Sequence, residues 1–191
     1  MTTYIPHLTL PQAVFDNPAV SIALPIAFGA AVGFGTTPTE TQKSQLALRQ
    51  PPYRPPPAAF PVVWTALYGL TGYAAYRAVH YGTSPLRSAE TIRLARHGAT
   101  LYTIQLGLNL AFMPLFYAFR RPVEASIDLV ALLGLNSYLI YVWSSVDRVA
   151  SWCLAPYLGW LGFATYLSVG TGYLNKWNFN SKQIPKDEEQ V

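Results

Sequence analysis

Apolar residues fall in long uncharged blocks along this chain, and most charged residues lie between the blocks. An ionised side chain costs several kcal/mol in the core of a bilayer, and a helix needs about 20 residues to cross it. Intervals of this length predict transmembrane helices over residues 18–36, 58–80, 94–119, 123–146 and 149–174. The pattern therefore predicts an all-α integral membrane protein, a bundle of five transmembrane helices.

The segments around these helices divide the chain into an N-terminal extension (1–17), a transmembrane domain (18–176) and a polar C-terminal tail (177–191). The connection at 120–122 is short, so the third and fourth helices should be antiparallel neighbours. The first loop, 35–57, is long and could hold a short helix within 39–48. It ends in a run of prolines that fixes where the second helix begins.

The distribution of lysine and arginine predicts the orientation, because cytoplasmic loops carry an excess of both. The side with the first loop and the C-terminus would hold Lys43, Arg49, Arg54, Arg120, Arg121, Lys176, Lys182 and Lys186. The opposite side would hold Arg77, Arg87, Arg93, Arg96 and Arg148. This excess places the C-terminus and the first loop in the cytosol.

The composition fits burial in lipid and argues against several classes of function. Charged residues make up 12% of the chain, about half the roughly 25% of a soluble protein. The net charge of +4 is too diffuse for a nucleic-acid-binding face. With one cysteine, Cys153, and histidines far apart in the sequence, no catalytic residue, metal or cofactor is expected.

Polar residues within the spans are the first candidates for function. Gln105 and Asn109 lie four apart, hence on one face of the third helix, and Asp128 lies inside the fourth. A buried polar group in lipid must find a partner or face a cavity. Two interpretations stay open: hydrogen bonds between helices, or the polar rim of a ligand pocket.

The fifth helix carries a face of Trp160, Ala164 and Leu167, which would suit a planar apolar ligand or a contact between helices. Val169, Tyr173 and Lys176 fit a loose sterol-recognition pattern. Small residues allow close helix contacts, so Gly29 and Gly33 could form a packing contact within one bundle or a dimer seam.

Three blocks of the sequence resemble the translocator protein family, also called tryptophan-rich sensory proteins or peripheral benzodiazepine receptors. Residues 53–68 are similar to the family segment W-x-P-P…F-P-x-V-W-T-x-L-Y. Residues 101–116 are similar to L-Y-x-x-Q-L-x-L-N-x-x-W-x-P-x-F, and residues 156–167 to P-Y-L-x-W-x-x-F-A-x-x-L. The likeness extends from about Pro25 to Asn175.

This resemblance implies a five-helix membrane protein whose pocket opens toward the first loop, which acts as a lid. Family members bind porphyrins and haem, sterols such as cholesterol, and benzodiazepine-type ligands, and a homodimer is expected. The resemblance favours the mitochondrial outer membrane, with the endoplasmic reticulum as an alternative. The ligand-binding residues that it implies are Tyr53, Pro56, Phe60, Trp64, Gln105, Asn109, Phe112, Ile127, Ala131, Trp160, Ala164 and Leu167.

The chain departs from the family pattern at several positions. Tyr53 and Ala58 stand where the first loop of the family has tryptophans, Phe112 replaces the tryptophan of the third helix, and Glu124 and Ser168 replace a tryptophan and an asparagine. An indole beside a bound porphyrin is implicated in the family's light-dependent porphyrin breakdown. We therefore expect a binding protein, carrier or sensor for flat apolar ligands. Porphyrin breakdown and a structural role in a membrane complex are the alternatives.

Overall fold

The computed structural model describes residues 5–36 and 48–179, and within these ranges it is helical with no strand. The proposed short helix within 39–48 and most of the C-terminal tail lie outside the described residues. The elements are η1 (Pro6–Leu8), α1 (Gln12–Asp16), α2 (Pro18–Thr36), α4 (Ala59–Tyr76), η2 (Arg77–Tyr81), α5 (Ala89–Met113), η3 (Pro114–Ala118), α6 (Pro122–Ser144) and α7 (Arg148–Leu174).

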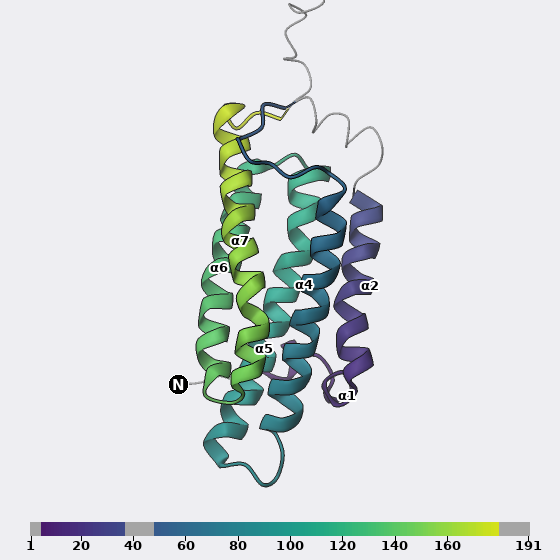
Figure 1. Ribbon diagram of the computed structural model, residues 1–191, viewed down its shortest axis with the longest axis vertical. Helices are drawn as coiled ribbons and strands as arrows, with labels where there is room; N and C mark the ends of the chain where they lie inside the picture. The colour runs from purple at the N-terminus through teal and green to yellow at the C-terminus, as the bar shows by residue number, and fades with distance from the viewer. Residues whose placement is uncertain (1–4, 37–47, 180–191) are drawn as a thin grey trace, which may run out of the picture.

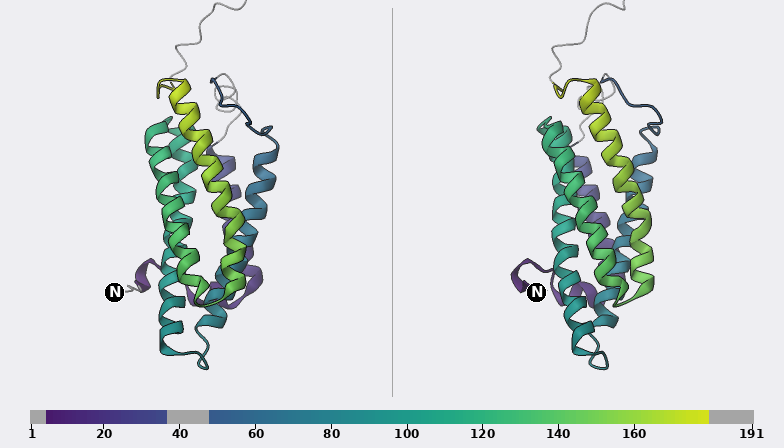
Figure 2. Two further views of the ribbon diagram at one scale, coloured as in Figure 1. Left: turned by 60° about the vertical axis from the view of Figure 1, so that its left-hand side comes forward. Right: turned by 90° about the vertical axis from the view of Figure 1, so that its left-hand side faces the viewer.

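The long helices α2, α4, α5, α6 and α7 lie side by side along the long axis of the molecule (Figure 1). Helix α2 packs on α4, α4 on α7, α7 on α6 and α6 on α5, and a smaller contact between α5 and α2 closes the ring. The side views show α6 and α7 as an antiparallel pair joined by a tight turn (Figure 2). Within the described part of the chain, three helical stretches are long and apolar enough to span a membrane: Pro18–Thr36, Ala89–Ala118 and Pro122–Ser144.

Two helices begin at capping residues that the sequence provides. The Ser88 hydroxyl accepts a hydrogen bond from the Thr91 backbone N–H at 3.2 Å, where α5 begins. The Asp147 carboxylate accepts from the backbone N–H of Val149 at 2.7 Å, where α7 begins. Side-chain caps satisfy backbone donors that a helix terminus leaves unpaired.

The predicted helix over 94–119 begins too late, because α5 starts at Ala89. Its first turn carries Glu90 and Arg93, which pair with each other at 2.5 Å on the exposed side of the helix. Charged residues mark the limits of the apolar layer and not of the helix, because a helix that extends beyond this layer carries charges at little cost. The predicted helix over 58–80 corresponds to α4 with the π-helical turn η2 that continues it.

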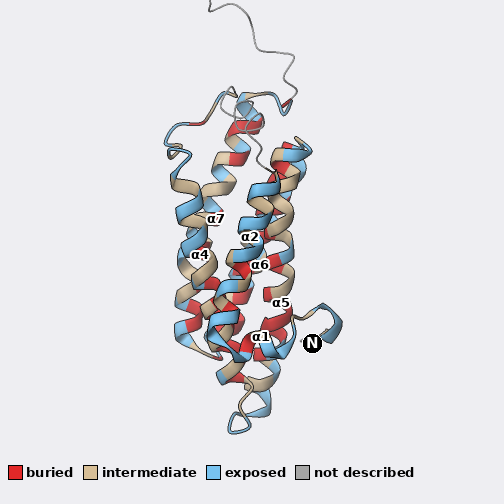
Figure 3. Ribbon diagram, turned by 90° about the vertical axis from the view of Figure 1, so that its right-hand side faces the viewer, coloured by how far each residue is buried: buried red, intermediate tan, exposed pale blue. Residues whose placement is uncertain are grey.

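The N-terminal segment is packed against the bundle. The Phe15 side chain is 0% exposed and lies in a cluster with Ala75, Tyr102 and Trp143. The Thr9 and Thr100 hydroxyls are 2.7 Å apart, which fastens this segment to α5. Buried positions are concentrated toward the end of the bundle that holds α1 (Figure 3).

Close contact between α2 and α4 depends on glycine. The Ser21 hydroxyl donates a hydrogen bond to the Gly72 carbonyl at 2.8 Å, so the two backbones nearly touch. Farther along, Gly29 packs on the Tyr68 ring, whereas a Cβ atom added at Gly33 would meet nothing within 4 Å. Gly29 therefore serves packing within one bundle, and the two glycines do not form a single outward seam.

Candidate functional site

An aromatic cluster lies between α4 and α7, toward the end where α4 begins. The Trp64 ring lies 6.3 Å from both the Tyr157 and Trp160 rings, measured between centroids and edge to face in each case. The Phe60 ring lies 5.8 Å from the Trp160 ring, also edge to face. Edge-to-face pairs bring the positive edge of one ring to the negative face of the other. The cluster therefore presents aromatic surface from two helices.

Asn109 joins three helices beneath this cluster. The Tyr68 hydroxyl of α4 donates a hydrogen bond to Asn109 Oδ1 of α5. Asn109 Nδ2 donates in turn to the Tyr157 hydroxyl of α7 at 2.7 Å. The Asn109 amide thus accepts from one tyrosine hydroxyl and donates to the other. These two hydrogen bonds fix the three side chains relative to one another. This arrangement favours the first of the two interpretations left open above, hydrogen bonds between helices.

Other polar atoms near the middle of the bundle are buried without a hydrogen-bond partner in the described part of the chain. They are Gln105 Oε1 on α5, Asp128 Oδ2 on α6 and Trp160 Nε1 on α7. Gln105 lies one turn from Asn109 on the same face of α5. A buried polar atom without a partner costs free energy, which a bound group of the opposite hydrogen-bonding type would recover. These atoms therefore support the second interpretation.

The structure brings together about half of the residues that the sequence predicted for the site. Buried Leu67, Leu132, Tyr157 and Leu161 form a cluster with part-buried Trp64, Phe112, Trp160 and Ala164, and Phe60 joins it through Trp160. Leu167 lies one turn beyond Ala164 on α7 and is part-buried.

Several predicted site residues lie elsewhere. Ile127 is 63% exposed, and Ala131 is exposed on the same outward face of α6, whose inward face carries Leu129 and Leu132. Pro56 is exposed. Tyr53 has a φ of 64° and a side chain that is 89% exposed, so the left-handed backbone at this position turns the ring away from the bundle.

Sequence reasoning missed the two tyrosines that hold Asn109. Tyr68 follows Trp64 by four residues, and Tyr157 precedes Trp160 by three, so each shares a helix face with a predicted site residue. This spacing is the feature of the sequence that could have identified the two tyrosines as site residues.

The described part of the first loop is fastened along the end of α7. The Arg49 backbone N–H donates to Asn175 Oδ1 at 3.1 Å, and Asn175 Nδ2 donates to the Arg49 carbonyl at 2.8 Å. The Tyr166 hydroxyl donates to the Pro52 carbonyl at 3.1 Å, and the Pro51 ring packs on Gly170. The loop is thus positioned by α7, beside the helix that carries Trp160.

Replacing Asn175 by alanine should loosen the first loop. The change removes both hydrogen bonds to the Arg49 backbone and leaves that peptide without these partners. We expect amide hydrogen exchange over residues 48–53 to become about fivefold faster, the equivalent of about 1 kcal/mol of local stability. Leu174→Ala, at an exposed neighbouring position, is the control. Equal exchange rates in the two variants would contradict the role assigned to Asn175.

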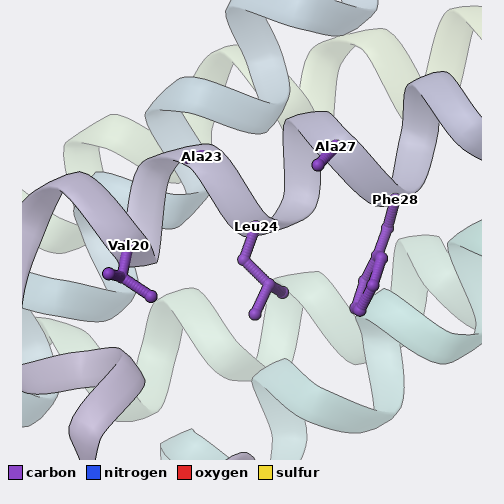
Figure 4. A pocket seen from close by; sticks show the side chains of 5 residues that line it. All are labelled: Val20, Ala23, Leu24, Ala27 and Phe28. Atoms are coloured by element: carbon purple, nitrogen blue, oxygen red, sulfur yellow. The ribbon is translucent and has the colours of Figure 1, made fainter.

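A hollow along α2 offers only apolar contact. It has a volume of about 330 Å³ and is lined by Val20, Ala23, Leu24, Ala27 and Phe28. Figure 4 shows Val20, Leu24 and Phe28 pointing to the same side of the helix. No hydrogen-bonding or charged side chain lines it, so it carries none of the polar groups that orient a ligand.

The remaining predicted features lie at the surface. Val169 borders a second hollow, Tyr173 is exposed, and Lys176 lies beyond the end of α7 with a φ of 53°. Within residues 5–36 and 48–179, no group of three or more histidine, cysteine, aspartate or glutamate side chains could hold a metal ion.

The sequence of this chain is similar to a known protein family and to several of its members. Residues 21–174 match the model of the TspO/MBR family. The chain is 39% identical to the translocator protein homolog of Schizosaccharomyces pombe over 152 residues, 80% of this chain and 88% of that one. It is 31% identical to the tryptophan-rich protein TspO of Chlorobaculum tepidum over 82% of this chain and 96% of that one. It is 31% identical to the human translocator protein over 79% of this chain and 86% of that one.

Proposed function

The chain belongs to the TspO/MBR family, and from this premise we propose that it binds a flat apolar ligand, a porphyrin, haem or a sterol, beside the aromatic cluster. The observation that carries the proposal is the arrangement around Trp160. Its ring packs edge to face on Trp64 and Phe60, while its buried Nε1–H has no acceptor among the described residues. An aromatic wall with one free donor suits a planar ligand that carries a hydrogen-bond acceptor.

We propose that α4 and α7 cross the membrane together with α2, α5 and α6, giving five spans. Helix α7 contains Pro156 and several tyrosine and tryptophan residues, which lower its hydropathy but are frequent in membrane helices and at the bilayer surface. The described end of the first loop, residues 48–57, is fastened to α7 and would act as the lid over the cluster.

From the family resemblance we also propose a homodimer in the mitochondrial outer membrane, or alternatively the endoplasmic reticulum. From the distribution of lysine and arginine we propose that the C-terminus lies in the cytosol. The role is that of a carrier or sensor, with no chemistry performed on the ligand. Under illumination, bound protoporphyrin should lose absorbance no faster than free protoporphyrin. Faster loss that disappears in a Trp160→Phe variant would favour light-dependent breakdown instead.

Replacing Trp160 by alanine should weaken ligand binding about tenfold, because the aromatic wall and the free indole donor are both lost. The measurement is a titration of detergent-solubilised protein with protoporphyrin, haem and cholesterol, followed by tryptophan quenching for the porphyrins and radioligand retention for the sterol. Trp152→Ala is the matched control, since Trp152 lies on the same helix and its side chain is 74% exposed.

The control also corrects for the loss of one tryptophan from the fluorescence signal. If none of the three ligands binds the wild-type protein, the proposed function fails. If a ligand binds equally well to both variants, the site lies away from Trp160.

A further inference from the structure

A second hollow lies on the outside of the bundle, between the start of α6 and the end of α7. Its volume is about 260 Å³, and it is lined by Val123, Ser126, Ile127, Val130, Val169 and Trp177. The Ser126 hydroxyl donates to the Pro122 carbonyl at 2.8 Å and lies 2.9 Å from the Ser168 hydroxyl. Its hydrogen bonds are made within the protein, so what the hollow offers to a ligand is apolar.

The chain beyond α7 closes one end of this groove. Lys176 and Trp177 both have left-handed backbones, with φ of 53° and 57°. The Trp177 backbone N–H donates to the Gly172 carbonyl at 2.7 Å, and the indole lies on Gly172, where any side chain would collide with it. Two residues later, Phe179 is buried against Phe116. The turn after α7 therefore holds the Trp177 indole at the end of the groove. Tryptophan is enriched where membrane and water meet, which fits this position at the end of a spanning helix.

Basic side chains stand at the same end. Arg121 immediately precedes α6 and its side chain is 64% exposed, while Lys176 is exposed beside Trp177. Glu124 is the acidic side chain of this rim, and it pairs with Arg121 at 3.2 Å in an exposed position where water weakens the attraction. The rim keeps a positive balance, because Lys176 has no acidic partner among the ion pairs of the described residues.

We propose that this groove binds an anionic phospholipid of the surrounding bilayer, with one acyl chain along Ile127 and Val130 and the phosphate beside Lys176 and Arg121. Apolar grooves with a basic rim at the membrane surface recognise lipids of this charge, and each basic residue near the surface contributes roughly 1 kcal/mol. A zwitterionic lipid gains less, because its own cation offsets the phosphate. The site is separate from the aromatic cluster and does not depend on the proposed ligand function.

The test counts lipids bound to the full chain by native mass spectrometry, with dioleoyl phosphatidylglycerol and dioleoyl phosphatidylcholine as probes of identical acyl chains. We expect phosphatidylglycerol to bind the wild-type protein about 25-fold more tightly, because Arg121 and Lys176 each contribute about fivefold. Lys176→Gln should reduce that preference about fivefold, and Arg121→Gln combined with it should abolish the preference. Both residues are exposed, so the variants should fold.

Ile127→Trp should fill the groove and reduce phosphatidylglycerol binding, whereas Tyr141→Trp, at an exposed position near the far end of the same helix, should not. Equal binding of the two lipids, or a preference that survives both charge changes, would overturn the proposal. So would a dimer that dissociates in Ile127→Trp while lipid binding stays the same, because the groove would then be occupied by a second copy of the chain.

Discussion

Gly72→Ala should lower the free energy of unfolding by about 3 kcal/mol, the upper part of the range for overpacked interiors. The added Cβ would lie 2.8 Å from Ile22 Cα and still nearer to the Ser21 carbonyl oxygen. Both neighbours are backbone, which cannot rotate away as the end of a flexible side chain can. Helix α2 would have to move off α4, and the hydrogen bond from Ser21 to the Gly72 carbonyl would be lengthened or lost.

The same helix provides the control. A Cβ at Gly69 would have its nearest neighbour, Ile26 Cδ1, at 3.8 Å, which is ordinary contact. Alanine is favoured over glycine within a helix by up to about 1 kcal/mol, so Gly69→Ala should be neutral or stabilising. Thermal unfolding in one detergent, followed by circular dichroism, compares the two. A Gly72→Ala protein as stable as Gly69→Ala would mean that α2 and α4 are not in the close contact described.

The sequence was sufficient to place most of the long helices. The predicted span 18–36 coincides with α2, and 149–174 differs from α7 by one residue, because charges, prolines and capping residues mark those limits locally. The predicted start of the third helix, residue 94, lies five residues after the start of α5 at Ala89, since nothing local distinguishes a charge that ends a helix from one on its exposed first turn. The packing of Phe15 in the core could not be predicted either, because it depends on residues of α5 and α6 far along the chain.

The sequence likewise predicts some features of the candidate site and not others. The spacing of Gln105 and Asn109 puts both on one face of α5, but the partners of Asn109 come from α4 and α7, which periodicity within one helix cannot identify. The outward position of Ile127 follows from how α6 is rotated against its neighbours. The exposure of Tyr53 follows from one left-handed residue in a proline-rich loop. Each of these is a consequence of tertiary packing.

The rotation of α6 also divides that helix between two roles. Asp128 and Leu132 face the bundle, where Leu132 packs with the aromatic cluster, while Ile127 and Val130 face outward and line the groove. Neighbouring residues of one turn thus face the interior of the bundle and the external groove.

Asn109→Leu should lower the free energy of unfolding by about 2 kcal/mol, because two hydrogen bonds disappear and two tyrosine hydroxyls lose their partner within the bundle. Leucine has the same number of side-chain heavy atoms as asparagine and the same branching at Cγ, so the loss reflects hydrogen bonding more than packing. Since Asn109 positions Tyr157 beside the Trp64 ring, ligand affinity in the porphyrin titration should also fall. The unfolding measurement is the same detergent melt used for the glycine variants.

A double-mutant cycle separates the two causes of this loss. In a protein that already carries Tyr68→Phe and Tyr157→Phe, Asn109→Leu strands no hydroxyl, so its cost should fall below about 1 kcal/mol. The difference between the two costs measures the coupling of the amide to the tyrosines. If Asn109→Leu costs the same in both backgrounds, the amide is not held by these hydroxyls, and the three helices must be joined by apolar packing alone.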